Sequence, residues 1–257
     1  MSLGSISQQF LREVEAVTGC PVQVQADEQL QAPLLARVQM ARGAVPLHRV
    51  TYHPNARAMV DYLIAFQCSF VLRTYTLTPS ERFDLTDTAE SNADSLAWVR
   101  SFPPSAGLPA DRQNAFADFL KTSLMSMLRS IPVGIRIDFD LRTRFPELQD
   151  AQEQALRRQV DTHAALLKPD IQRTVPEIPL RLNLGMNAAF AKFWGAEFHE
   201  PGWTLPYLAA GALGKGEALL TYLEALGVGP AHDRALIQSW ADELGLGHWL
   251  RWIPHSH

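Results

Sequence analysis

Residues 61–73 read DYLIAFQCSFVLR and lie inside a longer, strongly apolar segment, residues 56–74. Large apolar side chains recur in this segment every three or four residues, at Met59, Leu63, Phe66 and Phe70. Such spacing places them on one face of an α-helix. Pro54 stands just before the segment and closes the element that precedes it. The stretch therefore predicts an apolar helix that packs one face against a core.

A small sheet is expected in front of this helix. The chain first predicts a helix over residues 5–18, with Ser5 as its N-cap and Gly19 as its end. Short runs rich in β-branched residues then predict strands at residues 22–24, 36–40 and 47–52, with a hairpin turn around residues 42–44. The front of the chain therefore combines helices with a small sheet.

The remainder of the chain is predicted to be mainly helical. A helix over residues 86–99 is followed by a proline-rich connector at residues 102–109. The clearest strand pattern comes later, at residues 135–142, where apolar and charged residues alternate without a break. Further helices are expected at residues 111–129, 146–167, 186–194, 206–213, 217–226 and 231–244. The fold class is therefore α+β: a small N-terminal sheet packed on helices, then a mainly helical region containing one clear strand.

Composition narrows the classes of protein to consider. Of the 257 residues 47% are hydrophobic and 19% charged, as in ordinary globular proteins, and the net charge of −4 comes without a basic cluster that would favour nucleic acid. Two cysteines, Cys20 and Cys68, suggest a reducing compartment rather than a disulfide framework. No stretch reaches the about 18 apolar residues of a membrane span, and the start lacks a signal-peptide pattern. We therefore expect a cytoplasmic location without membrane attachment.

The apolar helix resembles the active-site helix of the ImmA/IrrE-type zincins, proteins of the gluzincin fold. In those proteins an HExxH motif places two histidines on one helix face as zinc ligands, with the glutamate between them as general base. Here the corresponding residues are Phe66, Gln67 and Phe70, so the motif reads Phe-Gln-Cys-Ser-Phe. The alternative is a plain core helix, since two phenylalanines at i and i+4 pack well on their own account.

A second point of resemblance lies downstream. The family commonly supplies its third zinc ligand as a glutamate in the pattern E-x-x-A-[N/D]-x-[F/L]-A, and residues 90–97 read ESNADSLA. Glu90 thus takes the third-ligand position, 20 residues after Phe70. The resemblance covers about residues 1–105 and implies a zincin-like α+β region with a degenerate active-site helix. Residues 106–257 form a second, mainly helical region of unknown type.

The chemistry of the replaced residues argues against zinc hydrolysis. A phenyl ring offers no lone pair to a metal, and the amide of Gln67 has no useful basicity near neutral pH. Glu90 alone cannot hold zinc, because the coordination energy of roughly 10 kcal/mol or more is shared among several ligands. We therefore expect no metal and no cofactor, and a non-catalytic module whose pocket is filled by Phe66 and Phe70. The resemblance implies a bacterial regulatory setting for such a module.

Other residues suggest a second hypothesis, an enzyme of another class. On a strand, Asp138 and Asp140 project from one face, although Arg136 and Arg142 would flank them in a self-compensating row of charges. His199 and Glu200, in a loop, would complete this alternative site. His48 and His53 could also approach Glu90 in a relocated metal site, but their spacing fits no known signature.

The C-terminal end supplies a third hypothesis, an assembly or interaction protein. Tryptophans gather there at positions 240, 249 and 252, and tryptophan is enriched in protein interfaces. The alternative is that these rings form the packed end of a helical subdomain. The glycine-rich residues 211–216 lack the spacing of a phosphate-binding loop and predict a turn between helices.

Overall fold

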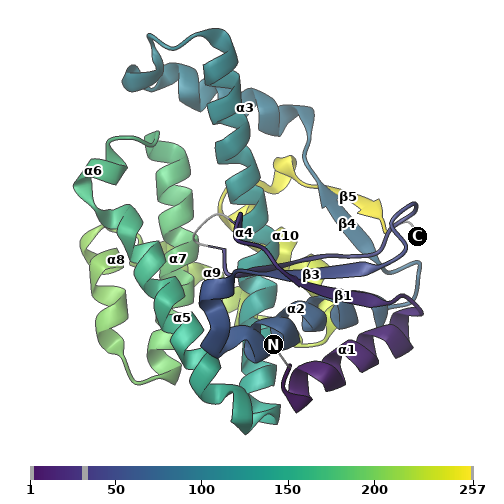
Figure 1. Cartoon of the computed structure of the whole chain (residues 1–257). Coiled ribbons are helices and arrows are strands. Elements are labelled where there is room, and N and C mark those ends of the chain that lie inside the picture. Colours follow the sequence, from purple (N-terminus) through teal and green to yellow (C-terminus); the bar gives the residue numbers. More distant parts are fainter. Residues whose placement is uncertain (1–2, 31–33, 256–257) are drawn as a thin grey trace. The chain divides into compact units, whose positions relative to one another are not determined.

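The structure, a computed structural model, describes residues 3–30 and 34–255, and at residue 57 the backbone alone (Figure 1). It confirms the α+β fold: most of the chain is helical, and two small sheets of three and two strands accompany the helices. The chain divides into two units, the first formed by residues 1–84, 136–159 and 254–257, and the second by residues 85–135 and 160–253.

The first unit contains the three-stranded sheet, in the order β1-β3-β2. Strands β1 and β3 are parallel, and β2 and β3 are antiparallel, so that Val24, Val50 and Val38 lie beside one another across the sheet. Helices α1 and α2 pack together and cover one side of it (Figure 1). The bounds are α1 Ser5–Thr18, β1 Val22–Ala26, β2 Ala36–Gln39, β3 His48–Tyr52 and α2 Val60–Tyr75.

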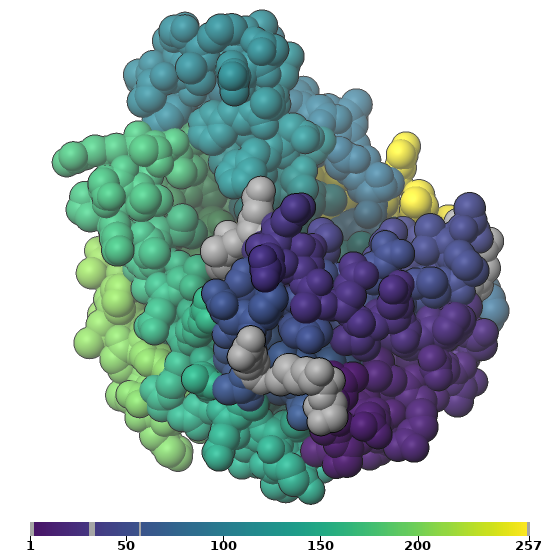
Figure 2. All heavy atoms as spheres, viewed as in Figure 1, coloured from purple at the N-terminus to yellow at the C-terminus, as the bar shows by residue number. Residues whose placement is uncertain are grey.

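Local signals in the sequence explain these elements. The helical spacing of Phe10, Val14 and Val17 predicts one apolar stripe on α1; Phe10 and Val14 are buried, whereas Val17 is 42% exposed. Gly19 ends α1 with a positive φ of 69°, and its N–H donates to the carbonyl of Glu15. Helix α2 begins four residues later than predicted, because a 3-10 turn, Pro54–Met59, comes first. The residues of α1, of the three-stranded sheet and of α2 are coloured purple to blue in Figure 2.

The strand predicted at residues 135–142 is wrong. These residues belong to the long helix α4, Ala110–Arg144, which continues through Pro132. Eight consecutive residues of it, 131–138, are buried, including the charged Arg136 and Asp138. A helix buried on all sides has no exposed face, so the alternation of apolar and charged residues could not report its period. The second sheet consists of two other strands, Phe83–Thr86 (β4) and Arg251–Pro254 (β5), which pair with each other.

The second unit is helical. Its core includes a cluster formed by Leu184, Ala188 and Tyr207, and another formed by Val99, Ala117 and Leu120. Helices α4 and α5 cross from one unit to the other, so neither unit is a continuous stretch of chain. The remaining bounds are α3 Ala89–Ser101, α5 Gln149–Ala164, α6 Pro169–Gln172, α7 Glu177–Glu197, α8 Leu205–Ala209, α9 Leu213–Ala225 and α10 Asp233–Glu243.

The two units do not follow the predicted division at residue 105. The chain returns to the first unit at residue 136 and leaves it again at residue 160. The proline-rich residues 102–109 lie inside the second unit, where Pro103–Ser105 forms a 3-10 turn. In the described part of the chain, no helix combines the length and apolarity that crossing a bilayer requires.

Two glycines of α9 make a matched pair for a test of packing. A Cβ at Gly216 would lie 2.6 Å from the backbone nitrogen of Ala189 in α7, so only glycine allows these helices to approach so closely. We expect Gly216→Ala to destabilise the protein by about 2 kcal/mol. Gly214 is exposed and an added Cβ meets nothing within 4 Å. Gly214→Ala should therefore stabilise the protein by about 0.5 kcal/mol. Urea unfolding measures both, and equal effects would contradict this packing.

Candidate functional site

Three aromatic rings form a stripe along α2, at the positions where the sequence resembles a zinc-binding helix. The ring centroids of Phe66 and Phe70 are 5.2 Å apart with an interplanar angle of 83°, an edge-to-face pair. The ring of Tyr62 lies 6.0 Å from that of Phe66. An edge-to-face pair contributes about 1 kcal/mol beyond the burial of its area. Both phenylalanines are half-buried, and each ring lies against another aromatic ring.

Gln67, between the two phenylalanines, has a structural role. Its side chain is nearly buried, with 9% exposed, and its Nε2 donates a hydrogen bond of 3.3 Å to the carbonyl of Ala36. Ala36 is the first residue of β2. The amide therefore joins α2 to the sheet, and the donor is used within the fold.

A buried carboxyl group lies beside the other end of this stripe. Asp138 of α4 accepts a hydrogen bond of 2.8 Å from the Tyr62 hydroxyl at Oδ1, and Gln152 Nε2 donates to the same oxygen at 3.3 Å and to the Asp138 carbonyl at 2.7 Å. Burial raises the pKa of Asp138 to about 7, although both hydrogen bonds act to lower it. Burial and the neighbouring carboxylate raise the pKa of Tyr62. Asp138 is thus a carboxyl group that titrates near neutrality inside the first unit.

Asp140 does not share a face with Asp138, which corrects the predicted pair. Two residues apart on a helix, side chains point about 200° away from each other. Asp138 is 2% exposed, whereas Asp140 is exposed and pairs with Arg144 at 3.0 Å. The predicted strand face with four charges in a row, at residues 136, 138, 140 and 142, therefore does not exist. The carboxylates of Asp138 and Asp140 do not form a joint acid–base site.

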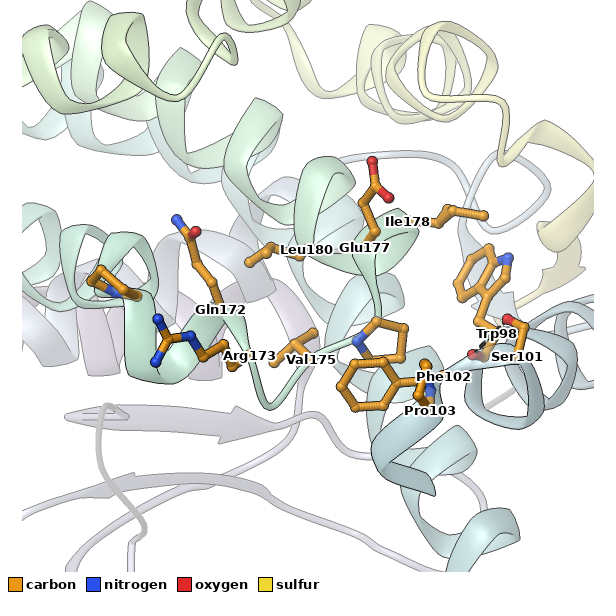
Figure 3. Close-up of a pocket in the computed structure, with 12 residues that line it drawn as sticks. Trp98, Ser101, Phe102, Pro103, Gln172, Arg173, Val175, Glu177, Ile178 and Leu180 are labelled. Atoms are coloured by element: carbon orange, nitrogen blue, oxygen red, sulfur yellow. Dashed lines mark hydrogen bonds between the residues drawn. The ribbon is translucent and has the colours of Figure 1, made fainter. Parts of the chain in front are cut away.

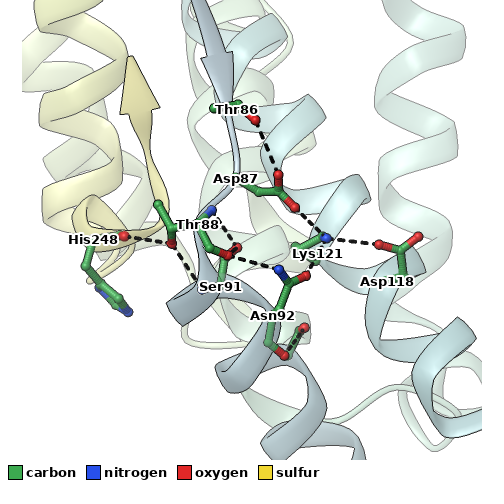
Figure 4. A network of polar contacts seen from close by, with 9 residues as sticks. Thr86, Asp87, Thr88, Ser91, Asn92, Asp118, Lys121 and His248 are labelled. Carbon is green, nitrogen blue, oxygen red and sulfur yellow. Dashed lines mark hydrogen bonds and ion pairs between the residues drawn. The ribbon is translucent and has the colours of Figure 1, made fainter. Parts of the chain in front are cut away.

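Glu90 is exposed in the first turn of α3. Thr88 and Ser91, which precede and follow it in sequence, belong to a polar network (Figure 4). The Thr88 hydroxyl accepts from the backbone of Ser91, and the Ser91 hydroxyl accepts from the backbone of Thr88, which makes a capping box. The nearly buried Lys121 Nζ lies 2.6 Å from Asp87, 2.6 Å from Asn92 and 3.0 Å from Asp118. The network fixes the start of α3. Glu90 belongs to the second unit and Phe66 to the first, so their proximity stays a prediction.

His48 and His53 both serve local structure. His48 is fully buried; its Nδ1 accepts from the Ala41 N–H at 3.1 Å, and its Nε2 lies 3.1 Å from the Thr18 hydroxyl. The Nδ1 of His53 accepts from the Asn55 N–H and caps the 3-10 turn before α2. Among the residues that the structure describes, no three or more His, Cys, Asp or Glu side chains gather as a metal site.

His199 and Glu200 follow the C-terminal end of α7. His199 is exposed and has a φ of 55°, the left-handed conformation that commonly follows a helix. The Glu200 N–H donates to the carbonyl of Gly195 at 2.7 Å. Both residues belong to the second unit and Asp138 to the first. Their participation in one site with Asp138 stays a prediction.

The C-terminal tryptophans lie mostly in the core, so the predicted aromatic surface is wrong for two of the three. Trp240 and Trp249 are fully buried, and only Trp252 is half-buried. Trp249 Nε1 donates to Asp94 at 2.9 Å, and its ring stacks on Trp98 of α3 at 5.0 Å. These rings pack the second unit, which was the alternative interpretation.

A cleft that the sequence did not indicate lies within the second unit (Figure 3). It has a volume of about 720 Å³ and lies between the end of α3 and the segment that joins α6 to α7. The only sequence signal is that both segments carry prolines at helix ends. The lining residues are Trp98, Ser101, Phe102, Pro103, Pro169, Gln172, Arg173, Val175, Pro176, Glu177, Ile178 and Leu180.

No protein-family model, no curated protein and no solved structure matches the chain.

Proposed function

We propose that this protein is a non-catalytic, zincin-like module that acts by binding rather than by hydrolysis, as a regulatory or partner-binding protein in the bacterial cytoplasm. The proposal rests on the contacts of three side chains of α2. Phe66 and Phe70 pack edge to face, and Gln67 is hydrogen-bonded to the sheet. These are the positions at which the resemblance expects two zinc ligands and a general base.

The energetics favour this interpretation over a weakened zinc site. A zinc site at this helix would lack two of its three protein ligands. It would therefore lose most of the roughly 10 kcal/mol of coordination energy. The rings gain about 1 kcal/mol from their mutual contact instead. The side chain of Gln67 contributes a buried hydrogen bond, worth about 1 kcal/mol. All three side chains thus stabilise the fold without a metal.

Thermal unfolding tests this proposal with the unaltered protein. We expect the melting temperature to be the same within about 1 °C in excess zinc, in a chelator and in buffer alone, because a ligand stabilises only the state that it binds. A rise of several degrees in zinc that the chelator reverses would contradict the proposal. A separate mixture of unrelated peptides, incubated with the protein, should show no cleavage above a chelator-treated sample.

A further inference from the structure

The cleft of the second unit has the size of a small-molecule site. Its volume of about 720 Å³ falls within the roughly 300–1,000 Å³ typical of such sites. Its lining has 12 residues, fewer than the roughly 20–30 that each side of a stable protein interface needs. The dimensions therefore favour a compact ligand over a folded partner.

One end of the cleft is aromatic and apolar. Trp98, in the last turn of α3, and Phe102, directly after this helix, are half-buried, so part of each ring remains accessible (Figure 3). The indole of Trp98 stacks on the buried Trp249, which holds it in place. Ile178, with 52% of its side chain exposed, adds an aliphatic surface. This combination suits a planar, apolar ring.

The other end carries an available positive charge. Arg173 is exposed, and no acidic partner for it occurs among residues 3–30 and 34–255. Helix α7 also begins at the cleft; its N-cap is Pro176, which has no side-chain acceptor for the first N–H groups. The one acidic side chain of the lining, Glu177, pairs with Arg181 at 3.6 Å. The cleft therefore favours an anion near Arg173.

We propose that the cleft binds a small amphipathic carboxylate, with a planar apolar body against Trp98 and Phe102 and its carboxylate at the guanidinium of Arg173. Arginine pairs with carboxylates through two parallel hydrogen bonds, which gives such a ligand an orientation. The inference goes beyond the proposed function. Every lining residue belongs to the second unit, whereas α2 belongs to the first. A failure of either proposal therefore leaves the other standing.

Calorimetric titration with matched probes tests the inference. The probes are 2-naphthoate, the neutral 2-naphthamide and the cationic 2-naphthylmethylamine. We expect 2-naphthoate to bind with a dissociation constant below roughly 1 mM, tighter than both analogues. Arg173→Gln should weaken 2-naphthoate at least tenfold and leave 2-naphthamide unchanged within about twofold. Glu177→Gln should tighten 2-naphthoate about twofold to threefold, since it removes the opposing carboxylate.

Two further variants separate the site from general effects. Ile178→Ser, at an exposed position, should weaken all three probes without unfolding the protein. Arg112→Gln, an exposed arginine on α4 outside the cleft, should change nothing. Absence of binding, equal affinity for the acid and the amide, or an unchanged affinity in Arg173→Gln would each overturn the inference. So would a peptide ending in phenylalanine that binds tenfold tighter than 2-naphthoate, because the occupant would then be a chain end.

Discussion

Replacing Phe66 and Phe70 by histidine and Gln67 by glutamate is expected to give the chain a zinc site. Two imidazoles at i and i+4 share one helix face, and the resemblance supplies Glu90 as a third ligand. We expect the triple variant to bind zinc at least 100-fold tighter than the unaltered protein, measured by competition with a zinc indicator. The cost is the loss of the edge-to-face pair and of the Gln67 hydrogen bond, about 2 kcal/mol together.

A matched control shows whether the gain belongs to this place in the fold. The same HExxH motif can be put on the exposed face of α4 with Asp111→His, Arg112→Glu and Ala115→His. Any helix with two histidines on one face binds zinc weakly, but only a site with a third ligand binds it well. Glu90→Gln in the α2 variant should therefore reduce its affinity to that of the control. An α2 variant that binds no tighter than the control would argue against a zincin-like arrangement.

Asp138→Asn is expected to raise the free energy of unfolding at pH 8, by about 4 kcal/mol at most. Burial raises the pKa of Asp138 from 3.8 to about 7, so the folded state favours the protonated acid. Each pKa unit corresponds to about 1.4 kcal/mol. The contribution of Asp138 to stability is therefore complete below pH 3.8, falls as the pH rises toward 7, and stays low above it. An asparagine is neutral at every pH and keeps an oxygen for Tyr62 and Gln152.

Urea unfolding of both proteins from pH 4 to pH 8 measures this effect. The difference in the free energy of unfolding between variant and unaltered protein should grow with pH up to about 7 and then level off. Asp140→Asn is the control; Asp140 is exposed and pairs with Arg144, so its loss should change stability by less than about 1 kcal/mol. A variant less stable than the unaltered protein at pH 8 would show that Asp138 is needed as a charge.

Local signals predicted much of the first unit. Gly19 marked the end of α1, and runs of β-branched residues located β1, β2 and β3 to within a few residues. The prediction failed at residues 135–142, where the charged Arg136 and Asp138 are buried, so burial does not follow the alternation of apolar and charged residues. Hydrophobic patterning detects faces in contact with water, and residues 135–138 have no such face.

The candidate sites were harder to predict, because they combine distant parts of the chain. The Tyr62–Asp138 hydrogen bond joins residues 76 positions apart. The cleft joins the end of α3 to residues about 70 positions later, and the sequence indicated only a connector at residues 102–109. The return of the chain to the first unit at residue 136 also has no local signature. Such arrangements depend on the path of the whole chain.

The most direct measurement is the zinc content of the unaltered protein, by native mass spectrometry after equilibration with a slight excess of zinc. The α2 triple variant serves as the positive control for retention of one ion. We predict that the unaltered chain has the mass of the metal-free polypeptide, because phenyl rings stand at the two positions where the resemblance expects zinc ligands. The result that would contradict a non-catalytic protein is one zinc ion retained per chain that is lost when Glu90 is replaced by glutamine.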